Sequence, residues 1–236
     1  MPDAEPKVAL LAGASGLVGT CALNALLAAP DVGRVFAITR RPLTREHPRL
    51  ANRIVQFDRL ETQLKGTTCH VALCCLGTTL QQAGSQQAFR QVDVDYVLAF
   101  ARAAKVAQTQ RFIVVSSAGA DRGARSFYLR TKGEMEQGLE NLGFASLDIL
   151  QPGPILGWRS QMRPLDLAMT LVMPLVNPFL VGTREVYRGI PAQTLGAAMT
   201  GATRSGRRGV QRYTFSGIQA LSRLKPATVA VAASKT

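Results

Sequence analysis

Three residues near the middle of the chain have the types and spacing for acid/base chemistry. Tyr128 and Lys132 are four positions apart, so a helix would place both side chains on one face. A neighbouring ammonium stabilises the phenolate form of a tyrosine, which suits Tyr128 to exchange a proton with a carbonyl or alcohol oxygen. Ser117, a short distance upstream, can donate a hydrogen bond to the same oxygen. The alternative is structural: Ser116 and Ser117 would cap a turn, and Tyr128 would be a half-buried aromatic.

A glycine-rich turn near the N-terminus predicts a dinucleotide site. The segment GASGLVG, residues 13–19, directly follows an apolar run and opens an apolar helix. Glycines allow a tight turn and close approach of a pyrophosphate, and a helix N-terminus supplies free N–H donors with a favourable dipole. A purely structural turn is the alternative. The residues expected to contact the cofactor here are Gly13, Ser15, Gly16, Leu17, Val18 and Gly19.

Two arginines indicate which dinucleotide is bound. An NAD site commonly has a carboxylate about 20 residues after the glycines, where it binds the ribose 2′-hydroxyl. This chain has Thr39 there, followed by Arg40 and Arg41. Guanidinium groups suit a 2′-phosphate, although arginines at the end of a strand are also ordinary surface residues. We therefore expect NADPH/NADP, with NADH less favoured, and Lys132 can hold the nicotinamide ribose.

These residues need a scaffold, and the hydrophobic pattern predicts a Rossmann-type α/β fold. Short apolar runs alternate with helical segments, which is typical of a doubly wound parallel sheet flanked by helices. We expect strands over 7–12, 34–39, 53–57, 71–76, 111–116, 144–150 and 210–215, and helices over 17–29, 85–106, 126–142 and 191–205. The prediction is one domain over 1–236, with a small C-terminal substrate or lid region at about 153–225 and a loose tail from about 226.

An apolar stretch at 165–181 is open to two interpretations. Its two prolines, Pro174 and Pro178, and its length argue against a membrane span. The stretch is either a core helix with a connecting turn, or an apolar lid or partner surface. The arginines that flank it favour an anionic or amphipathic substrate: Arg159, Arg163, Arg184 and Arg188.

Composition limits the other classes. The 236 residues carry a net charge of +13 with 47% hydrophobic residues, but Lys and Arg are scattered without aromatic interleaving, so nucleic-acid binding is not favoured. The N-terminus does not resemble a signal peptide. The cysteines lack metal-ligand spacing, so we expect no metal and a reducing, cytoplasmic setting. The adjacent Cys74 and Cys75 are interpreted as core residues; the others are Cys21 and Cys69.

The glycine turn, the Ser117–Tyr128–Lys132 set and the strand order together resemble the short-chain dehydrogenase/reductase superfamily. Four segments are similar to its atypical, Tat-interactive-protein-like branch: CCLGTT (74–79), VDVDY (92–96), SSAGA (116–120) and YLRTKGE (128–134). The resemblance covers most of residues 7–215 and implies NADPH binding. It also implies that Leu76, Gly77 and Thr78 lie along the ribose and pyrophosphate, Asp58 near the adenine, and Pro152 and Gly153 at the nicotinamide amide.

Two positions depart from the superfamily pattern. Gln151 stands where many extended members have arginine, and Asp93 aligns with a helix asparagine that often orders water behind the lysine. A carboxylate at position 93 either changes the proton relay or caps a polar pocket.

The function predicted first is NADPH-dependent reduction of a carbonyl-like small-molecule substrate. One alternative is a regulatory protein that binds NADP(H) and a protein partner with little turnover. A second alternative is a nucleotide-sugar epimerase or dehydratase-like isomerase, which is disfavoured because the segment after Pro152 is short. Pairing as a homodimer stays open.

Overall fold

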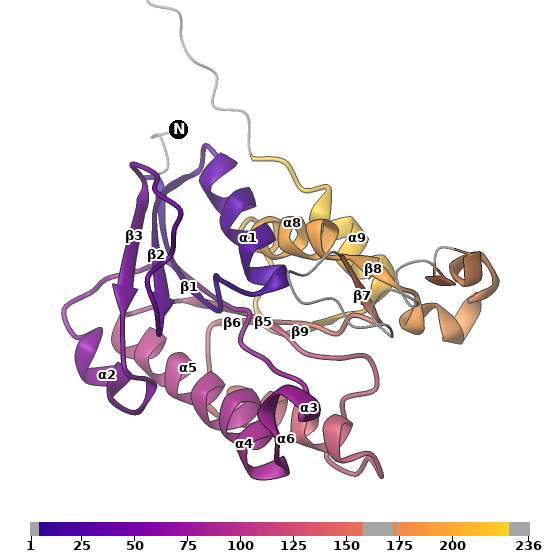
Figure 1. The fold of residues 1–236 in the computed structure, drawn as a ribbon. Helices are drawn as coiled ribbons and strands as arrows, with labels where there is room; N and C mark the ends of the chain where they lie inside the picture. The colour runs from indigo at the N-terminus through magenta and orange to yellow at the C-terminus, as the bar shows by residue number, and fades with distance from the viewer. Residues whose placement is uncertain (1–4, 158–171, 174, 227–236) are drawn as a thin grey trace, which may run out of the picture.

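The computed structural model describes residues 5–157, 172–173 and 175–226, and its centre is one seven-stranded parallel sheet (Figure 1). The strands are β1 (Lys7–Ala12), β2 (Val32–Thr39), β3 (Leu50–Ile54), β4 (Val71–Cys74), β5 (Arg111–Val115), β6 (Ser146–Leu150) and β9 (Gly209–Tyr213). Their order is β3-β2-β1-β4-β5-β6-β9. The predicted Rossmann-type fold is confirmed.

The order of the strands determines where a ligand can bind. The chain runs from β1 outward to β2 and β3, then crosses back to β4 on the other side of β1. Ala12 at the end of β1 pairs with Ile38 of β2 and with Cys74 of β4. In open α/β sheets, ligands bind outside the carboxyl ends of the strands at such a switch point. The loops after β1, β2, β4, β5 and β6 therefore surround the candidate site.

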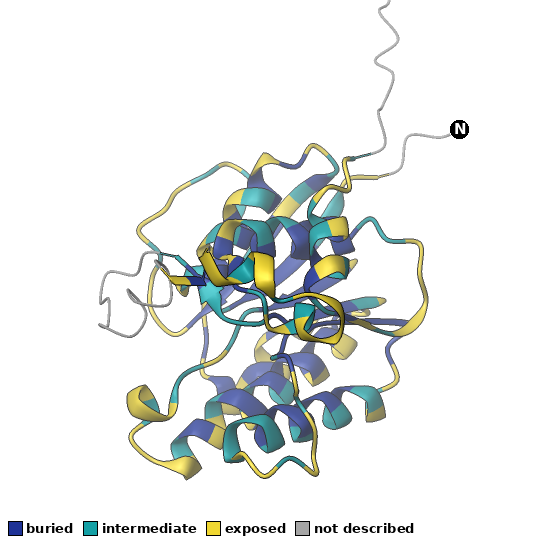
Figure 2. Ribbon diagram, turned by 90° about the vertical axis from the view of Figure 1, so that its right-hand side faces the viewer, coloured by how far each residue is buried: buried dark blue, intermediate teal, exposed yellow. Residues whose placement is uncertain are grey.

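Helices cover both faces of the sheet (Figure 1). One face packs against α1 (Leu17–Ala28), α8 (Ala192–Ala202) and α9 (Phe215–Ser222). The other face packs against α2 (Leu60–Gln63), α5 (Tyr96–Val106) and α6 (Phe127–Asn141). In Figure 2 the buried residues of both helical layers face the sheet, and the exposed residues lie on the outside.

The long helix expected over 85–106 is not uniform. It consists of α4 (Gln86–Arg90), a π-helical turn η2 (Gln91–Asp95) and α5, preceded by the short α3 (Leu80–Ala83). Ser85 caps α4 by accepting a hydrogen bond from the backbone of Ala88. Single π-turns are often found at functional sites, and this one contains the buried Asp93.

The third strand lies earlier than predicted. The expected strand over 53–57 is β3 at Leu50–Ile54, and its pairing with β2 ends at Thr39 and Ile54. Phe57 begins the 3₁₀ turn η1 (Phe57–Arg59) and packs against Tyr96 at 5.1 Å between ring centroids. The apolar residues after position 54 are buried by a helix, not by strand pairing.

Much of the predicted lid region belongs to the main layers. Helices α8 and α9 cover the sheet, and β9 is its edge strand. The remaining part contains the paired strands β7 (Ile155–Leu156) and β8 (Ile190–Pro191), and the 3₁₀ turns η3 (Asn177–Phe179) and η4 (Gly182–Tyr187). The apolar stretch 165–181 lies in part outside the described residues. Arg159, Arg163 and the tail 227–236 lie wholly outside them.

Across the described ranges, no helix has the length and apolar character needed to cross a membrane.

Candidate functional site

The glycine turn, residues 13–19, excludes side chains at Gly13 and Gly19, and we call it the glycine cradle. Gly13 has φ +81°, and a Cβ there would lie 2.5 Å from the carbonyl oxygen of Cys75. A Cβ on Gly19 would lie 1.9 Å from the carbonyl oxygen of Gly13, because the first turn of α1 packs directly on the loop. Gly16 is the N-cap of α1, whose first turn has no acidic residue. The N-terminus of α1 is therefore open to an anion.

Ser15 and Gly16 are exposed at this turn, Leu17 is half-buried, and Val18 faces the core. Of these four residues, Ser15 is the one with an exposed polar side chain.

Arg40 and Arg41 follow β2 and lie beside the glycine turn, because β1 and β2 pair up to their carboxyl ends. Both side chains are exposed, and neither has a hydrogen bond or ion pair with another described residue. Both guanidinium groups are therefore available to a ligand at the carboxyl edge of the sheet.

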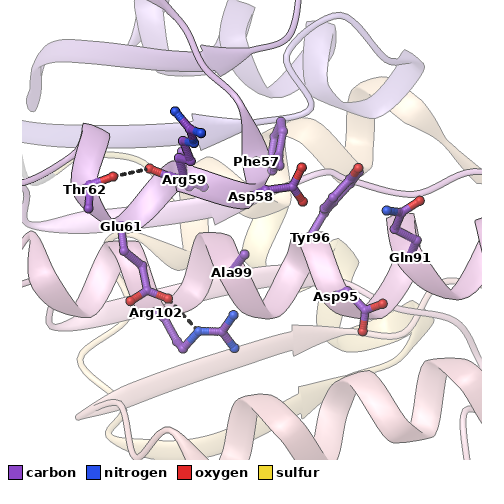
Figure 3. Close-up of a pocket in the computed structure, with 11 residues that line it drawn as sticks. Phe57, Asp58, Arg59, Glu61, Thr62, Gln91, Asp95, Tyr96, Ala99 and Arg102 are labelled. Atoms are coloured by element: carbon purple, nitrogen blue, oxygen red, sulfur yellow. Dashed lines mark hydrogen bonds and ion pairs between the residues drawn. The ribbon is translucent and has the colours of Figure 1, made fainter.

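Asp58 lies farther along the same edge, in η1. It lines a cavity of about 610 Å³ between η1, α2 and the π-turn and α5. In Figure 3, Asp58, Tyr96 and Gln91 have their polar groups at one end of this cavity, and the ion pair of Glu61 with Arg102 lies at the other. At its first end, the cavity combines the exposed carboxylate of Asp58 with the ring of Tyr96, and these two groups suit a flat base with an amino group.

Lys132 is held by a buried carboxylate from a different helix. Its Nζ lies 2.7 Å from Oδ1 of Asp93 in η2, and both side chains are almost completely buried. The other oxygen, Oδ2, accepts a hydrogen bond of 2.8 Å from the backbone N–H of Thr78. A Cβ on Gly77 would contact both Asp93 and Lys132, so the loop after β4 lies directly against this pair. The loop, the π-turn and α6 are thus joined at one point.

The charge of Lys132 is secure in this environment. Burial on its own would lower the pKa of Lys132, but the negative charge of Asp93 and the influence of Tyr128 outweigh it, and the pKa is raised. Lys132 is therefore an ammonium throughout the neutral range.

Tyr128 lies one turn before Lys132 on α6, in the predicted arrangement. Its ring packs against Phe89 of α4 at 5.7 Å between centroids, and the residue is half-buried. Ser117 follows β5 and is also half-buried, with its Oγ only 3.4 Å from the carbonyl oxygen of Ala118. Ala118 N–H donates to the carbonyl oxygen of Pro152 at 2.8 Å, so the loops after β5 and β6 are tied together.

A second buried carboxylate contacts the loop after β5 at Ser116 and was missed in the sequence. Glu136, in the next turn of α6 after Lys132, accepts hydrogen bonds from Ser116 Oγ at 2.5 Å and from Gln151 Nε2 at 2.9 Å. Arg212 of β9 reaches the same carboxylate at 3.2 Å. Gln151, the departure from the arginine pattern, is therefore a partner of Glu136. The i and i+4 spacing of Lys132 and Glu136 was the available signal.

The segment before β8 folds against the loops of the site. A Cβ on Gly153 would lie 2.5 Å from the carbonyl oxygen of Arg188, and Tyr187 Oη lies 3.9 Å from the corresponding position on Gly119. Arg188 donates to the carbonyl oxygen of Leu180 at 2.7 Å and lies over the ring of Phe215. Arg188 is thus committed to the fold, whereas Arg184 is exposed.

Cys74 is completely buried in the core, as expected, and Cys75 is partly buried and packs against the core. All four cysteines are free thiols. Burial raises the pKa of Cys74 to about 12 and also raises the pKa of Cys75, whose sulfur lies 3.3 Å from that of Met199. Both thiols are protonated and unreactive at neutral pH.

Comparisons with known proteins agree with this architecture. The HIM1 family matches residues 53–174. Protein HTATIP2 of Rattus norvegicus is 38% identical over 164 residues, which cover 68% of this chain and 67% of that protein. A protein named fmp52, mitochondrial, of Emericella nidulans is 37% identical over 172 residues, covering 68% and 71%. That name places the fungal protein in mitochondria; the cytoplasmic setting expected for this chain stays a prediction.

Solved structures share the fold at low sequence identity. MoeE5 in complex with UDP-glucose and NAD has a TM-score of 0.64 and 18% identity, with 87% of this chain and 75% of that chain covered. The human epimerase family protein SDR39U1 with NADPH has a TM-score of 0.60 and 17% identity, covering 88% and 74%. The family match and the identity to HTATIP2 and fmp52 bear out the predicted resemblance. The chain therefore belongs to the HIM1 family and has a Rossmann-type fold.

Proposed function

We propose that this protein is an NADPH-dependent reductase that acts on a carbonyl-like substrate. The observation that carries the proposal is that α6, which carries Tyr128 and Lys132, meets two loops of the site. Glu136 of α6 binds Ser116, and Lys132 lies against the loop after β4 that also packs on Gly13. All of these groups lie at the carboxyl edge of the sheet, where the strand order reverses.

The residues present fit a dinucleotide. A Cβ at Gly13 or Gly19 would collide with neighbouring backbone, so the chain keeps a side-chain-free cradle at the N-terminus of α1 for a pyrophosphate. Arg40 and Arg41 would hold a 2′-phosphate, and Asp58 would accept a hydrogen bond from the adenine amino group. Along the remaining length the holding residues would be Leu76, Gly77, Thr78, Lys132, Pro152 and Gly153. The solved neighbours bound to NAD or NADPH support a nicotinamide cofactor for this chain as well.

The chemistry of this chain's residues follows from their positions. A nicotinamide cofactor supplies the hydride when it is bound. Ser117 would donate a hydrogen bond to the substrate carbonyl oxygen and orient it. Tyr128 would give its hydroxyl proton to that oxygen as the carbonyl carbon is reduced, and would recover a proton from solvent afterwards. Lys132 would hold the ribose hydroxyls with the ammonium hydrogens that Asp93 does not use.

The test is NADPH oxidation with a panel of aldehydes and ketones, in which wild type is compared with Tyr128→Phe. The proposal predicts turnover that falls about a hundredfold or more in Tyr128→Phe, since positioned acid catalysis contributes on that scale. NADPH binding, measured by fluorescence, should be retained by the variant because its ring still packs on Phe89. A Tyr128→Phe variant with the wild-type rate would overturn the proposal.

A second candidate is a regulatory protein that binds NADP(H) and a protein partner. The observation that favours it is a group of exposed apolar side chains before and within η3 and η4, among them Phe179 at 81% and Leu175 at 73% exposure. NADPH binding without turnover on any substrate of the panel would favour this candidate. A homodimer stays a prediction, checked by the mass of the protein in solution.

A further inference from the structure

Three titratable side chains from three elements act on Lys132. Asp93 comes from the π-turn η2, Tyr128 from the preceding turn of α6, and Cys74 from the end of β4. Burial keeps Cys74 a protonated thiol at neutral pH, whereas Asp93 forms an ion pair with Lys132. Its carboxylate oxygen lies 2.7 Å from the ammonium nitrogen, and neither side chain is exposed to screening by water.

Asp93 is fixed in this position. The N–H of Thr78 donates to Oδ2, which leaves Oδ1 to Lys132, and the backbone of Gly77 lies against both groups. Asp93 therefore cannot turn away from the lysine without breaking a buried hydrogen bond. Seen from Tyr128, the pair is a dipole, and a dipole exerts a much weaker field than a free ammonium at the same place.

We infer that Asp93 is a positioning residue that cancels much of the charge of Lys132, so that Tyr128 serves as a proton donor and the site works in the direction of reduction at neutral pH. The inference rests on the proposed function. In reduction the carbonyl carbon gains the hydride from NADPH, the oxygen gains the Tyr128 proton, and NADPH is oxidised to NADP. The reverse reaction needs the phenolate of Tyr128 to remove the alcohol proton. With a neutral amide at position 93, the ammonium of Lys132 would be uncompensated and would favour that phenolate.

The experiment is a pH titration of Tyr128, followed through the absorbance of tyrosinate. The signal of Tyr128 is obtained by subtracting the titration of the Tyr128→Phe variant in each background. In Asp93→Asn, the midpoint should fall by roughly one pH unit or more, because a free ammonium then faces the phenol. The control is Glu134→Gln, which removes a half-exposed carboxylate two positions from Lys132. This carboxylate pairs with Arg90 at 3.2 Å, and its removal should leave the Tyr128 midpoint unchanged. An unchanged midpoint in folded Asp93→Asn would overturn the inference.

Asp93→Asn removes the partner of a buried cation and can fail to fold. The double variant Asp93→Asn/Lys132→Gln then serves instead, since it replaces the ion pair with a neutral pair. If the charges cancel in the wild type, the Tyr128 midpoint in the double variant should match the wild-type midpoint. An upward shift of roughly one pH unit or more would show that Lys132 acts on Tyr128 uncompensated, and the inference would be wrong.

Failure of the inference and failure of the proposed function can be distinguished. The titration needs neither substrate nor cofactor, whereas the proposed function fails if wild type oxidises NADPH with none of the aldehydes and ketones. Where turnover is seen, the pH above which reduction slows should move down in Asp93→Asn together with the Tyr128 midpoint. A titration that shifts while the pH profile of reduction stays fixed would contradict the assignment of Tyr128 as the donor.

Discussion

Glu136 accepts a hydrogen bond of 2.5 Å from Ser116, the residue directly before Ser117. Through this contact α6, which carries Tyr128 and Lys132, is attached to the loop after β5. Gln151 and Arg212 bind the same carboxylate, so β6 and β9 are attached to it as well. One buried carboxylate thus links the helix that carries Tyr128 and Lys132 to the loop that carries Ser117.

Replacing Glu136 should destabilise the protein. Glu136→Gln weakens three polar contacts in a buried place, and we expect the free energy of unfolding in urea to fall by about 1–3 kcal/mol. The control is Glu134→Gln on the same helix, where a half-exposed ion pair is worth about 0–1 kcal/mol. Equal stability of wild type and Glu136→Gln would contradict the role of this residue.

Alanine should destabilise the protein much more at Gly13 than at Gly16 of the glycine turn. Gly13→Ala introduces a Cβ at positive φ, 2.5 Å from a carbonyl oxygen, and should lower the free energy of unfolding by about 2 kcal/mol or more. A Cβ at Gly16 meets its nearest atom at an ordinary 3.4 Å, so Gly16→Ala should cost roughly 1 kcal/mol or less. Thermal unfolding of the two variants side by side checks this order. Gly16→Ala as destabilised as Gly13→Ala would contradict it.

Burial of Cys74 predicts a dependence of stability on pH. The thiol loses its proton at 9.0 in the unfolded chain but at about 12 in the folded protein. Between these values the unfolded state binds fewer protons, so the stabilisation present below pH 9.0 is lost as the pH rises toward 12. The free energy of unfolding of wild type should fall relative to Cys74→Ala by about 1.4 kcal/mol per pH unit in this window. Parallel curves for the two proteins would show that the folded thiol titrates normally.

The parts of the fold that follow from local pattern were predictable. β1, β4 and β5 are short apolar runs buried on both faces, and the glycine turn could only follow the first of them. The position of β3 was not predictable in this way, because Val55 and Phe57 look like strand residues. Phe57 packs against Tyr96 on α5, about 40 residues later, and Val55 is buried in the same apolar cluster.

The candidate site was predictable to the extent that its residues are close in sequence. Tyr128 and Lys132 share a helix face, and spacing alone indicates this. The ion pair of Asp93 with Lys132 joins two helical segments and depends on a π-turn. The hydrophobic periodicity of the sequence does not predict such a turn. Asp93 was recognised as a departure, but its partner needed the tertiary structure.

We propose that this chain binds NADPH through Arg40 and Arg41, and a fluorescence titration with NADPH and NADH tests this binding mode. Wild type should prefer NADPH, and Arg40→Ala and Arg41→Ala should each weaken NADPH binding about tenfold or more while NADH binding changes little. Arg208→Ala, which removes the same charge at the amino edge of the sheet beside β9, should bind NADPH like wild type. Equal affinity of wild type for the two cofactors would contradict a preference for NADPH. NADPH binding that is unaffected by loss of both arginines would contradict their role in holding the 2′-phosphate.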